Sequence, residues 1–286
     1  MHTNSHPAAA PALVHTGGQE ALRRIQAQAR YVFAADEFAV LTGRAARSAA
    51  VKQALQRLSR RGLIISASKQ PSRWLIVPPE HAHYGAPPVD WWLNDYLKPI
   101  EPHYYVALLS AAKYWGSSHY AKQSTQVMVS KPRLALAVGR LRVDFFSKRN
   151  IANTPIGVAR ANVAHWRVST REATLLDLIR HQSAVGGLEA VARICKDLVP
   201  ALELNALGMA LDALGQVAAA QRLGFIFEQL DAAHAAQKVA QWLAQRRVTI
   251  QPLESNADVE GMAVCENSRW HIAYLPSQET ILKELR

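Results

Sequence analysis

The spacing of apolar and polar residues between positions 35 and 77 predicts two helices followed by a two-stranded hairpin. A short helix over 35–41 leads through a turn into a longer helix over 44–61, and Gly62 follows in the position where helices often end. One side of the longer helix is apolar and would pack inward, through Val51, Ala54, Leu55 and Leu58. This order of elements is typical of a winged helix-turn-helix domain.

The hairpin is predicted from two apolar runs, 63–65 and 74–77, on either side of a polar link over 66–73. The polar side of the longer helix carries side chains that reach base edges and phosphates when a helix lies in the major groove. We expect base contacts from Ser48, Lys52, Gln53 and Gln56. We expect contacts with phosphates or the minor groove from Arg44, Arg47, Arg57, Arg60 and, at the hairpin tip, Lys69 and Arg73. The alternative is a basic amphipathic helix that only exposes a solvated face.

The excess of basic over acidic residues is confined to the first 160 residues of the chain. The formal net charge is +11, and residues 1–80 hold 11 Lys and Arg against 4 acidic residues. Residues 81–160 hold 10 against 4, whereas residues 161–286 hold 12 against 14. A basic excess around a helix-turn-helix pattern is the electrostatic footprint of a nucleic-acid-binding protein, so we expect double-stranded operator DNA as a partner.

The 286-residue chain is long enough for about two domains. Residues 1–16 are rich in Ala, Pro and His and predict a disordered tail without the features of a secretory signal. The winged helix-turn-helix is expected over 17–80, and a proline-punctuated linker over 81–88. Residues 89–286 are expected to form a larger mixed domain with short strands and a C-terminal helical part. The predicted fold class is therefore α+β.

Periodicity predicts the elements of the larger domain. Ser169 and Glu172 have the spacing of a capping box at the start of a helix. Other helices are expected near 89–97, 104–115, 188–198, 203–214, 217–230 and 235–246, and strands at 126–129, 141–146 and 166–168.

A second group of cations follows the predicted linker. Residues 140–146 alternate, so that Arg140, Arg142 and Asp144 project from one side of a strand. A possible secondary DNA contact is formed by Lys131, Arg133, Arg140, Arg142, Lys148 and Arg149. A solvated strand face is the alternative. The aromatic residues Trp91, Trp92, Tyr104, Tyr105, Tyr114 and Trp115 predict packing in a core or domain junction, with a stacking platform for single-stranded nucleic acid as the alternative.

Catalytic signals are weak, and we expect a protein that is not an enzyme. No phosphate-binding glycine loop, nucleophile elbow or metalloprotease motif is present. His81 and His83 lack Cys or acidic companions for zinc, and Asp144 with Lys148 lacks a second nearby carboxylate to hold a metal. No metal or cofactor is therefore expected. Two cysteines and no long apolar segment predict a cytoplasmic protein without a membrane partner.

Three strings of the sequence resemble the AbiEi family of antitoxins. They are YYVALLSAAKYWG at 104–116, STREATLLDL at 169–178 and QRLG at 221–224. The resemblance implies the antitoxin of a type IV abortive-infection toxin-antitoxin pair, which represses its own operon and neutralises a nucleotidyltransferase-like toxin. It also implies neutralisation without the stable complex that other antitoxins form. The front helix-turn-helix matches the family only in general pattern, so no operator sequence is carried over.

Two other classes of function remain open at this point. One is a DNA-binding regulator whose second domain binds a small molecule in a pocket lined by the aromatic residues. The other is an enzyme that acts on nucleic acid or on the toxin, which the winged domain would only deliver. A ligand that shifts DNA affinity would favour the first, and metal- or nucleotide-dependent turnover would favour the second.

Overall fold

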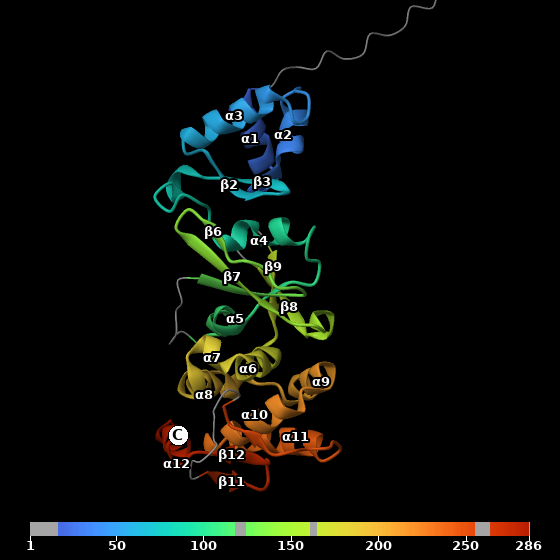
Figure 1. Ribbon diagram of the computed structural model, residues 1–286, viewed down its shortest axis with the longest axis vertical. Coiled ribbons are helices and arrows are strands. Elements are labelled where there is room, and N and C mark those ends of the chain that lie inside the picture. The colour runs from blue at the N-terminus through green and yellow to red at the C-terminus, as the bar shows by residue number, and fades with distance from the viewer. Residues whose placement is uncertain (1–16, 118–123, 161–164, 255–263, 286) are drawn as a thin grey trace, which may run out of the picture. The chain divides into compact units, whose positions relative to one another are not determined.

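The computed structural model describes residues 17–117, 124–160, 165–254 and 264–285, and the predicted tail over 1–16 lies outside them (Figure 1). The chain divides into two compact units, one over residues 1–96 with 137–141, and the other over 97–136 with 142–286. Helices and strands occur in both units, which confirms the α+β class.

Three helices and a three-stranded antiparallel sheet begin the first unit. The helices are α1 (Gly18–Gln26), α2 (Ala35–Leu41) and α3 (Ala49–Arg60), and the strands are β1 (Val32–Ala34), β2 (Ile64–Lys69) and β3 (Ser72–Ile76). The sheet order is β1-β3-β2, because β1 pairs with β3 from the side opposite the hairpin. Sequence reasoning missed β1, whose three residues are too few to show an alternating pattern.

A single hydrophobic cluster holds these elements together. Phe33 of β1 and Phe38 of α2 are fully buried between the helices and the sheet. They pack with the apolar sides of α1 and α3, which include Ile25 and Leu55. The inward face predicted for α3 is confirmed, since Val51, Ala54, Leu55 and Leu58 are all buried.

The first unit extends past the hairpin through the short 3-10 helix η1 (Pro79–His81) to α4 (Val89–Leu97). The predicted linker over 81–88 lies inside this unit. The ring of Trp91 contacts those of Tyr31 and His81, with centroids 4.9 Å and 5.0 Å away. Trp92 is buried, and its Nε1 donates a hydrogen bond to the carbonyl of Pro87 at 3.1 Å. Aromatic packing therefore attaches this segment to the unit that precedes it.

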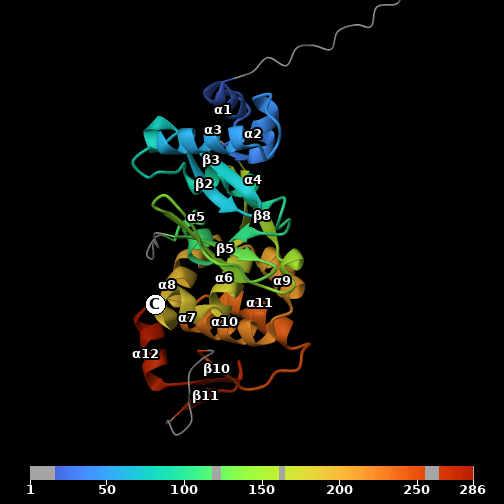
Figure 2. The same ribbon diagram turned by 45° about the horizontal axis from the view of Figure 1, so that its top comes forward.

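A six-stranded mixed sheet has the order β6-β7-β5-β4-β9-β8. Two of its strands, β5 and β8, are labelled in Figure 2. Its strands are β4 (Tyr105–Val106), β5 (Ser124–Val129), β6 (Leu136–Val138), β7 (Leu141–Ser147), β8 (Ile156–Arg160) and β9 (His165–Ser169). Strand β5 is parallel to β7, and β4 is parallel to β9. Residues 137–141, between β6 and β7, are grouped with the first unit.

Helices make up most of the remainder of the second unit. They are α5 (Leu108–Tyr114), α6 (Arg171–Arg180), α7 (Gln182–Val185), α8 (Gly187–Leu198), α9 (Leu204–Leu214), α10 (Val217–Gln229), α11 (Ala233–Leu243) and α12 (Pro276–Glu284), with 3-10 turns η2 (Ile151–Asn153) and η3 (Val199–Ala201). A small sheet, β10-β12-β11, consists of β10 (Gln251–Pro252), β11 (Cys265–Asn267) and β12 (Ile272–Tyr274). Both α6 and α10 are buried along most of their length. Helix α6 contacts α5, α8, α9 and α10, and helix α10 also contacts α8, α11 and α12.

The structure corrects two predictions in the second unit. The helix expected over 104–115 begins only at Leu108, because Tyr105 and Val106 form β4 and pair with Met128 and Val127. The capping box expected at Ser169 is wrong. Ser169 ends β9, while Thr170 caps α6 and its Oγ1 accepts a hydrogen bond from the backbone N–H of Ala173 at 3.3 Å.

Candidate nucleic-acid interface

Helix α3 is the element that presents the predicted DNA-contacting side chains. It begins at Ala49 rather than at Arg44, because Ser48 is its N-cap and its Oγ accepts a hydrogen bond from the Val51 N–H at 3.3 Å. Arg47, immediately before the cap, has a φ of 57°, which no helix can contain. Ser48 therefore stabilises the start of α3.

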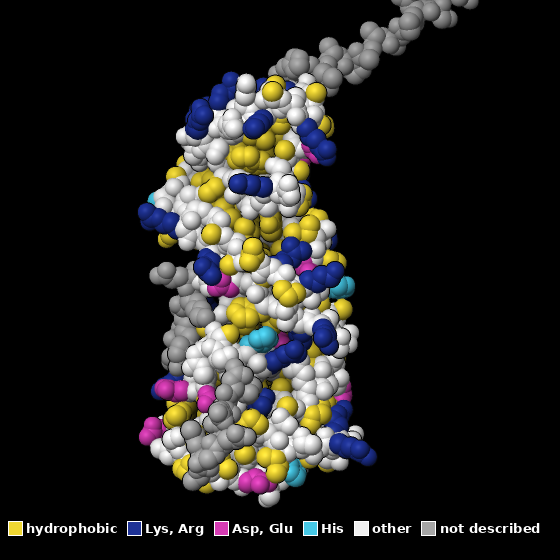
Figure 3. Space-filling view, in the orientation of Figure 1, with side chains coloured by type: hydrophobic (Ala, Val, Ile, Leu, Met, Phe, Trp, Pro, Cys, Tyr) yellow, Lys and Arg dark blue, Asp and Glu magenta, His cyan; other side chains and the backbone are white. Residues whose placement is uncertain are grey.

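The side of α3 opposite its buried residues is polar and exposed. Lys52 and Gln56 are one helical turn apart, so they lie on the same strip of the helix surface. The exposed side chains of this strip and its borders are Lys52, Gln53, Gln56, Arg57 and Arg60. Figure 3 shows that Lys and Arg predominate over acidic residues on the visible surface of the first unit. The arrangement offers hydrogen-bond donors and acceptors flanked by cations.

The cations outside α3 lie in two loops. Arg44 and Arg47 occupy the connection between α2 and α3, and the Arg44 backbone N–H donates to the carbonyl of Ala39 at 2.9 Å. Lys69 is the last residue of β2 and pairs with Ser72 across the hairpin. Arg73 pairs with Ser68 one step further from the tip. The hairpin thus holds Lys69 at its tip, as predicted, with Arg73 half-buried beside it.

A small hollow of about 260 Å³ separates α3 from the hairpin. Lys52 and Gln56 border it on the helix side, and Trp74 and Ser72 border it on the strand side. The Trp74 Nε1 donates to the Ser72 Oγ at 3.1 Å, which fixes the indole as one wall. The hollow therefore lies beside the polar strip of α3, and the bottom of the hollow is mainly apolar.

The second predicted cation group is only partly available to a ligand. Lys131, Arg133, Arg140 and Arg149 are exposed. Arg133 donates a hydrogen bond to the carbonyl of Ile100 at 3.3 Å. Arg142 is also exposed, but its Nε donates to the Asp144 carboxylate at 2.7 Å, so part of its charge is neutralised. Arg140 lies in the turn before β7 and not in the strand that was expected to carry it.

Lys148 was expected among the secondary DNA contacts, but the structure corrects this expectation because the side chain is buried. It is 3% exposed, and its Nζ lies 2.7 Å from Oδ1 of Asp177 on α6. The hydroxyl of Tyr105 donates to Oδ2 of the same carboxylate at 2.7 Å. Burial lowers the pKa of the Lys148 ammonium and raises the pKa of the Tyr105 hydroxyl, whose ionisation the Asp177 charge also opposes. The three side chains form an internal polar cluster, because a buried charge requires a partner.

The aromatic residues expected to pack inside the protein are divided between core and surface. Trp92, Tyr104 and Tyr105 are buried, whereas Tyr114 is exposed. Trp115 is half-buried, and its Nε1 donates to the carbonyl of Ser169 at 2.8 Å. Rings that pack in this way leave no stacking platform at these buried positions.

Two features are absent from the part of the chain that the structure describes, a metal-binding cluster and a membrane-spanning helix. In that part, no three His, Cys, Asp or Glu residues gather closely enough to bind a metal ion. None of its helices combines the length and the apolar character needed to span a bilayer.

One segment of the chain is similar to a known family, and the fold of the chain is similar to that of a solved structure. Residues 105–229 match the family model described as the AbiEi antitoxin C-terminal domain, which confirms the resemblance of the sequence to AbiEi antitoxins. No curated protein matches the chain. The fold is similar to that in the crystal structure of the RV2827C protein from Mycobacterium tuberculosis, with a TM-score of 0.61 and 17% identity over 91% of this chain and 93% of the other.

Proposed function

We propose that this protein, whose residues 105–229 match the AbiEi antitoxin C-terminal domain, is the antitoxin of an abortive-infection toxin-antitoxin pair and represses its own operon. The domain match supports the antitoxin role. The partner would be a nucleotidyltransferase-like toxin in the cytoplasm. Operator DNA would be bound by the first unit, which we interpret as a winged helix-turn-helix formed by α1–α3 and the β2–β3 hairpin.

The observation that carries the DNA-binding proposal is the exposed polar strip of α3. An α-helix fits the major groove of B-DNA, where Lys and Gln side chains read base edges. Lys52, Gln53 and Gln56 are exposed and would take that role, while Ser48 caps the helix and is less available. The cations at the borders of the strip and in the hairpin would contact the phosphates: Arg44, Arg47, Arg57, Arg60, Lys69 and Arg73.

The exposed members of the second cation group would add nonspecific contacts with the DNA backbone. Lys131, Arg133, Arg140 and Arg149 supply charge without a recognition element of their own, whereas the exposed Arg142 is paired with Asp144. Each phosphate contact would strengthen binding and steepen its salt dependence without selecting a sequence. Lys148 is excluded from this group because it is buried with Asp177.

Neither alternative function gains a specific observation in its favour. A ligand pocket formed by the aromatic residues would need accessible rings, but Trp92, Tyr104 and Tyr105 are buried in packed surroundings. An enzyme would need a cluster of reactive groups in a cleft. Lys148, Asp177 and Tyr105 do form a cluster, but the Lys148 and Asp177 side chains are 2% and 0% exposed, which withholds them from a substrate.

The first experiment is a titration of the full-length protein against a labelled duplex from upstream of its gene and against random duplex, at two salt concentrations. We expect the upstream duplex to bind about a thousandfold more tightly or better, as specific DNA-binding proteins do. Equal and steeply salt-dependent binding to both duplexes would refute autoregulation, since it would leave only electrostatic attraction.

The same titration tests the role of α3. Replacing Lys52 and Gln56 by Ala should abolish the preference for the upstream duplex, because each good base contact contributes about 1–3 kcal/mol of discrimination. The fold should persist, since both side chains are exposed. The matched control is Lys113→Ala with Gln28→Ala, which removes the same types of exposed side chain elsewhere. Discrimination that survives the α3 change would assign sequence reading to another element.

A further inference from the structure

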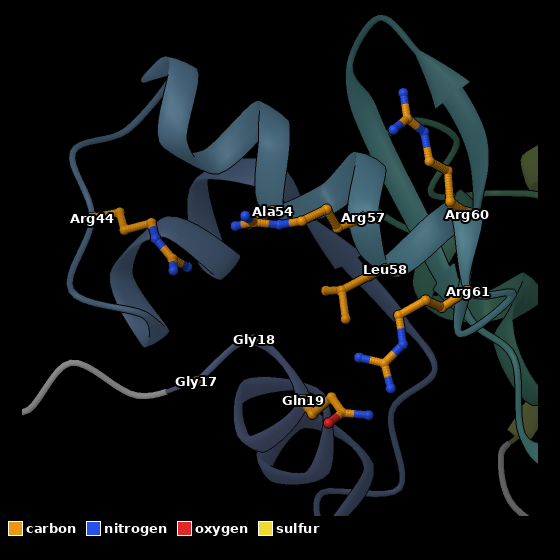
Figure 4. A pocket seen from close by; sticks show the side chains of 9 residues that line it. All are labelled: Gly17, Gly18, Gln19, Arg44, Ala54, Arg57, Leu58, Arg60 and Arg61. Atoms are coloured by element: carbon orange, nitrogen blue, oxygen red, sulfur yellow. The ribbon is translucent and has the colours of Figure 1, made fainter.

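An arginine-lined groove of about 480 Å³ lies at the border of α3, on the side away from the hairpin. It is bounded by the start of α1, by the loop between α2 and α3, and by the C-terminal half of α3. In Figure 4, the guanidinium group of Arg61 points towards Gln19, Arg44 enters from the opposite side of the groove, above Gly17, Arg57 crosses the upper wall, and Arg60 points away. The groove has no acidic residue in its lining.

The arginines of this groove have no carboxylate partner among the residues that the structure describes. The ion pairs nearby belong to other side chains: Glu20 pairs with Arg23 and Arg24. The Nη1 of Arg44 is shielded from solvent and donates no hydrogen bond to a described residue. Residues 1–16, which precede the groove, contain no Asp or Glu. The groove therefore concentrates positive charge that none of the described carboxylates neutralises.

Helix α1 adds backbone donors to the same groove. Its N-cap is Gly17, which has no side chain to accept hydrogen bonds from the first turn. The N–H groups of Gly18 and Gln19 consequently remain without partners within the helix. Gly18 also contacts Leu58 and Phe38, since a Cβ there would lie 3.4 Å from both side chains, and this packing fixes the helix start against α3. Backbone N–H groups at a helix N-terminus favour anions, phosphate above all.

Stabilisation of the α3 dipole is a simpler explanation for the arginines of the groove, but it accounts for only two of them. Cations in the last turn of a helix stabilise its dipole, which would explain Arg57 and Arg60. It does not explain Arg44, which comes from a different segment and converges on the same space. It also does not explain the uncapped start of α1 at Gly17.

We propose that this groove is a phosphate-binding site, in which Arg44 and Arg61 clamp the phosphate oxygens and the N-terminus of α1 donates backbone hydrogen bonds. Two sources supply this chemistry. One is a phosphodiester of DNA bound along α3, since a helix in the major groove is flanked by both backbones, and this source rests on the proposed function. The other is a free phosphate ester, which would bind whether or not the protein binds DNA.

The experiment has two arms on the full-length protein. In the first, the melting temperature is measured against inorganic phosphate at constant ionic strength, since a ligand of the folded state raises it. In the second, DNA affinity is measured against salt concentration. The test variant is Arg44→Gln with Arg61→Gln, and the control is Lys98→Gln with Lys113→Gln, which removes the same charge from exposed positions.

The outcomes distinguish the two sources. A smaller salt slope in the test variant, by about 0.9 for one lost phosphate contact, together with an unchanged slope in the control, assigns the site to the DNA backbone. A phosphate-dependent rise in melting temperature that the test variant loses, with an unchanged slope, assigns it to a free phosphate ester. If neither arm separates the test variant from the control, the proposal is overturned. If the wild-type protein binds no DNA, the proposed function fails and the first arm still decides the phosphate site.

A further variant separates ligand binding from folding. Gly17 has the extended backbone of an N-cap, and nothing lies within 4 Å of a Cβ built there. Gly17→Asp places a carboxylate on the free N–H groups of α1, so it should raise the melting temperature without phosphate and abolish the response to phosphate. An undiminished phosphate response in this variant would exclude the α1 N-terminus from the site.

Discussion

Lys148 and Lys52 carry the same charge in opposite surroundings. Lys52 is exposed on α3, whereas Lys148 is enclosed with Asp177 and Tyr105 inside the second unit. A charged group that is removed from water needs an oppositely charged partner at hydrogen-bond distance. The Asp177 carboxylate, 2.7 Å from the Lys148 ammonium, is that partner. Only the exposed lysine is available to a ligand. The distinction lies in burial, which the local sequence does not reveal.

The Lys148–Asp177 pair leads to a prediction for stability. Lys148→Met leaves the buried Asp177 carboxylate without its cation, which should lower the free energy of unfolding by about 3–5 kcal/mol. The double variant Lys148→Met with Asp177→Leu should recover much of that loss, because no buried charge remains. Urea unfolding of the wild type and the variants would measure both effects. Losses in the single variants that simply add in the double variant would contradict an interaction between the two groups.

Helix α3 shows what local signals can and cannot predict for an element. Its buried face follows from the apolar spacing, and its end before Gly62 follows from the glycine. Its start does not, because residues 44–48 are polar and small and fit a helix equally well. The capping hydrogen bond of Ser48 and the positive φ of Arg47 set the start at Ala49. Boundaries of this kind depend on single backbone conformations.

Close packing of helix α10 against Trp270 leads to a prediction for stability. A Cβ at Gly224 would lie 2.0 Å from the ring of Trp270, which closes that side of the helix. Gly224→Ala should therefore destabilise the protein by about 1–3 kcal/mol or more through overpacking. In a helix with open space the same change would stabilise it by about 1 kcal/mol. Thermal unfolding would show whether the protein is stabilised or destabilised. Gly157→Ala in strand β8, with nothing within 4 Å of its Cβ, is the control for a methyl group added without crowding. A stabilised Gly224 variant would show that Trp270 moves aside without cost.

At the scale of the whole molecule, the two proposed activities belong to different parts of the chain. The polar strip of α3 lies in the first unit, whereas the antitoxin match covers residues 105–229, nearly all of which lie in the second. The excess of basic residues does not follow this division, because residues 81–160 hold 10 Lys and Arg against 4 acidic residues and lie mostly in the second unit. Binding to DNA and neutralisation of the toxin would then rest on separate surfaces.

Separate surfaces predict separable defects. Cells that express the toxin together with the Lys52→Ala, Gln56→Ala variant should grow as well as cells with the wild-type antitoxin, because residues 105–229 are unchanged. The same variant should fail to repress a reporter placed behind its own promoter. Growth rates and reporter activity, compared at matched protein levels, would measure the two effects. Loss of both activities in a folded variant would show that neutralisation requires DNA binding.

The sequence by itself determined the features that depend on local spacing and on composition. The hairpin, the apolar side of α3 and α4 at Val89–Leu97 follow from periodicity, and the excess of basic residues in the first 160 positions can be counted directly. The strings at 104–116 and 169–178 likewise sufficed for the resemblance that the match over residues 105–229 confirms.

Only the tertiary structure decided which distant residues meet. It brings Lys148 to Asp177 across 29 positions, and it brings Arg44, Arg61 and the start of α1 around one groove. Arg61 and Gly17 carry no local signal for such a site, since a helix-ending arginine and a glycine after a tail are common. Contacts between segments depend on how the chain packs its apolar faces together, and that packing is a property of the whole fold.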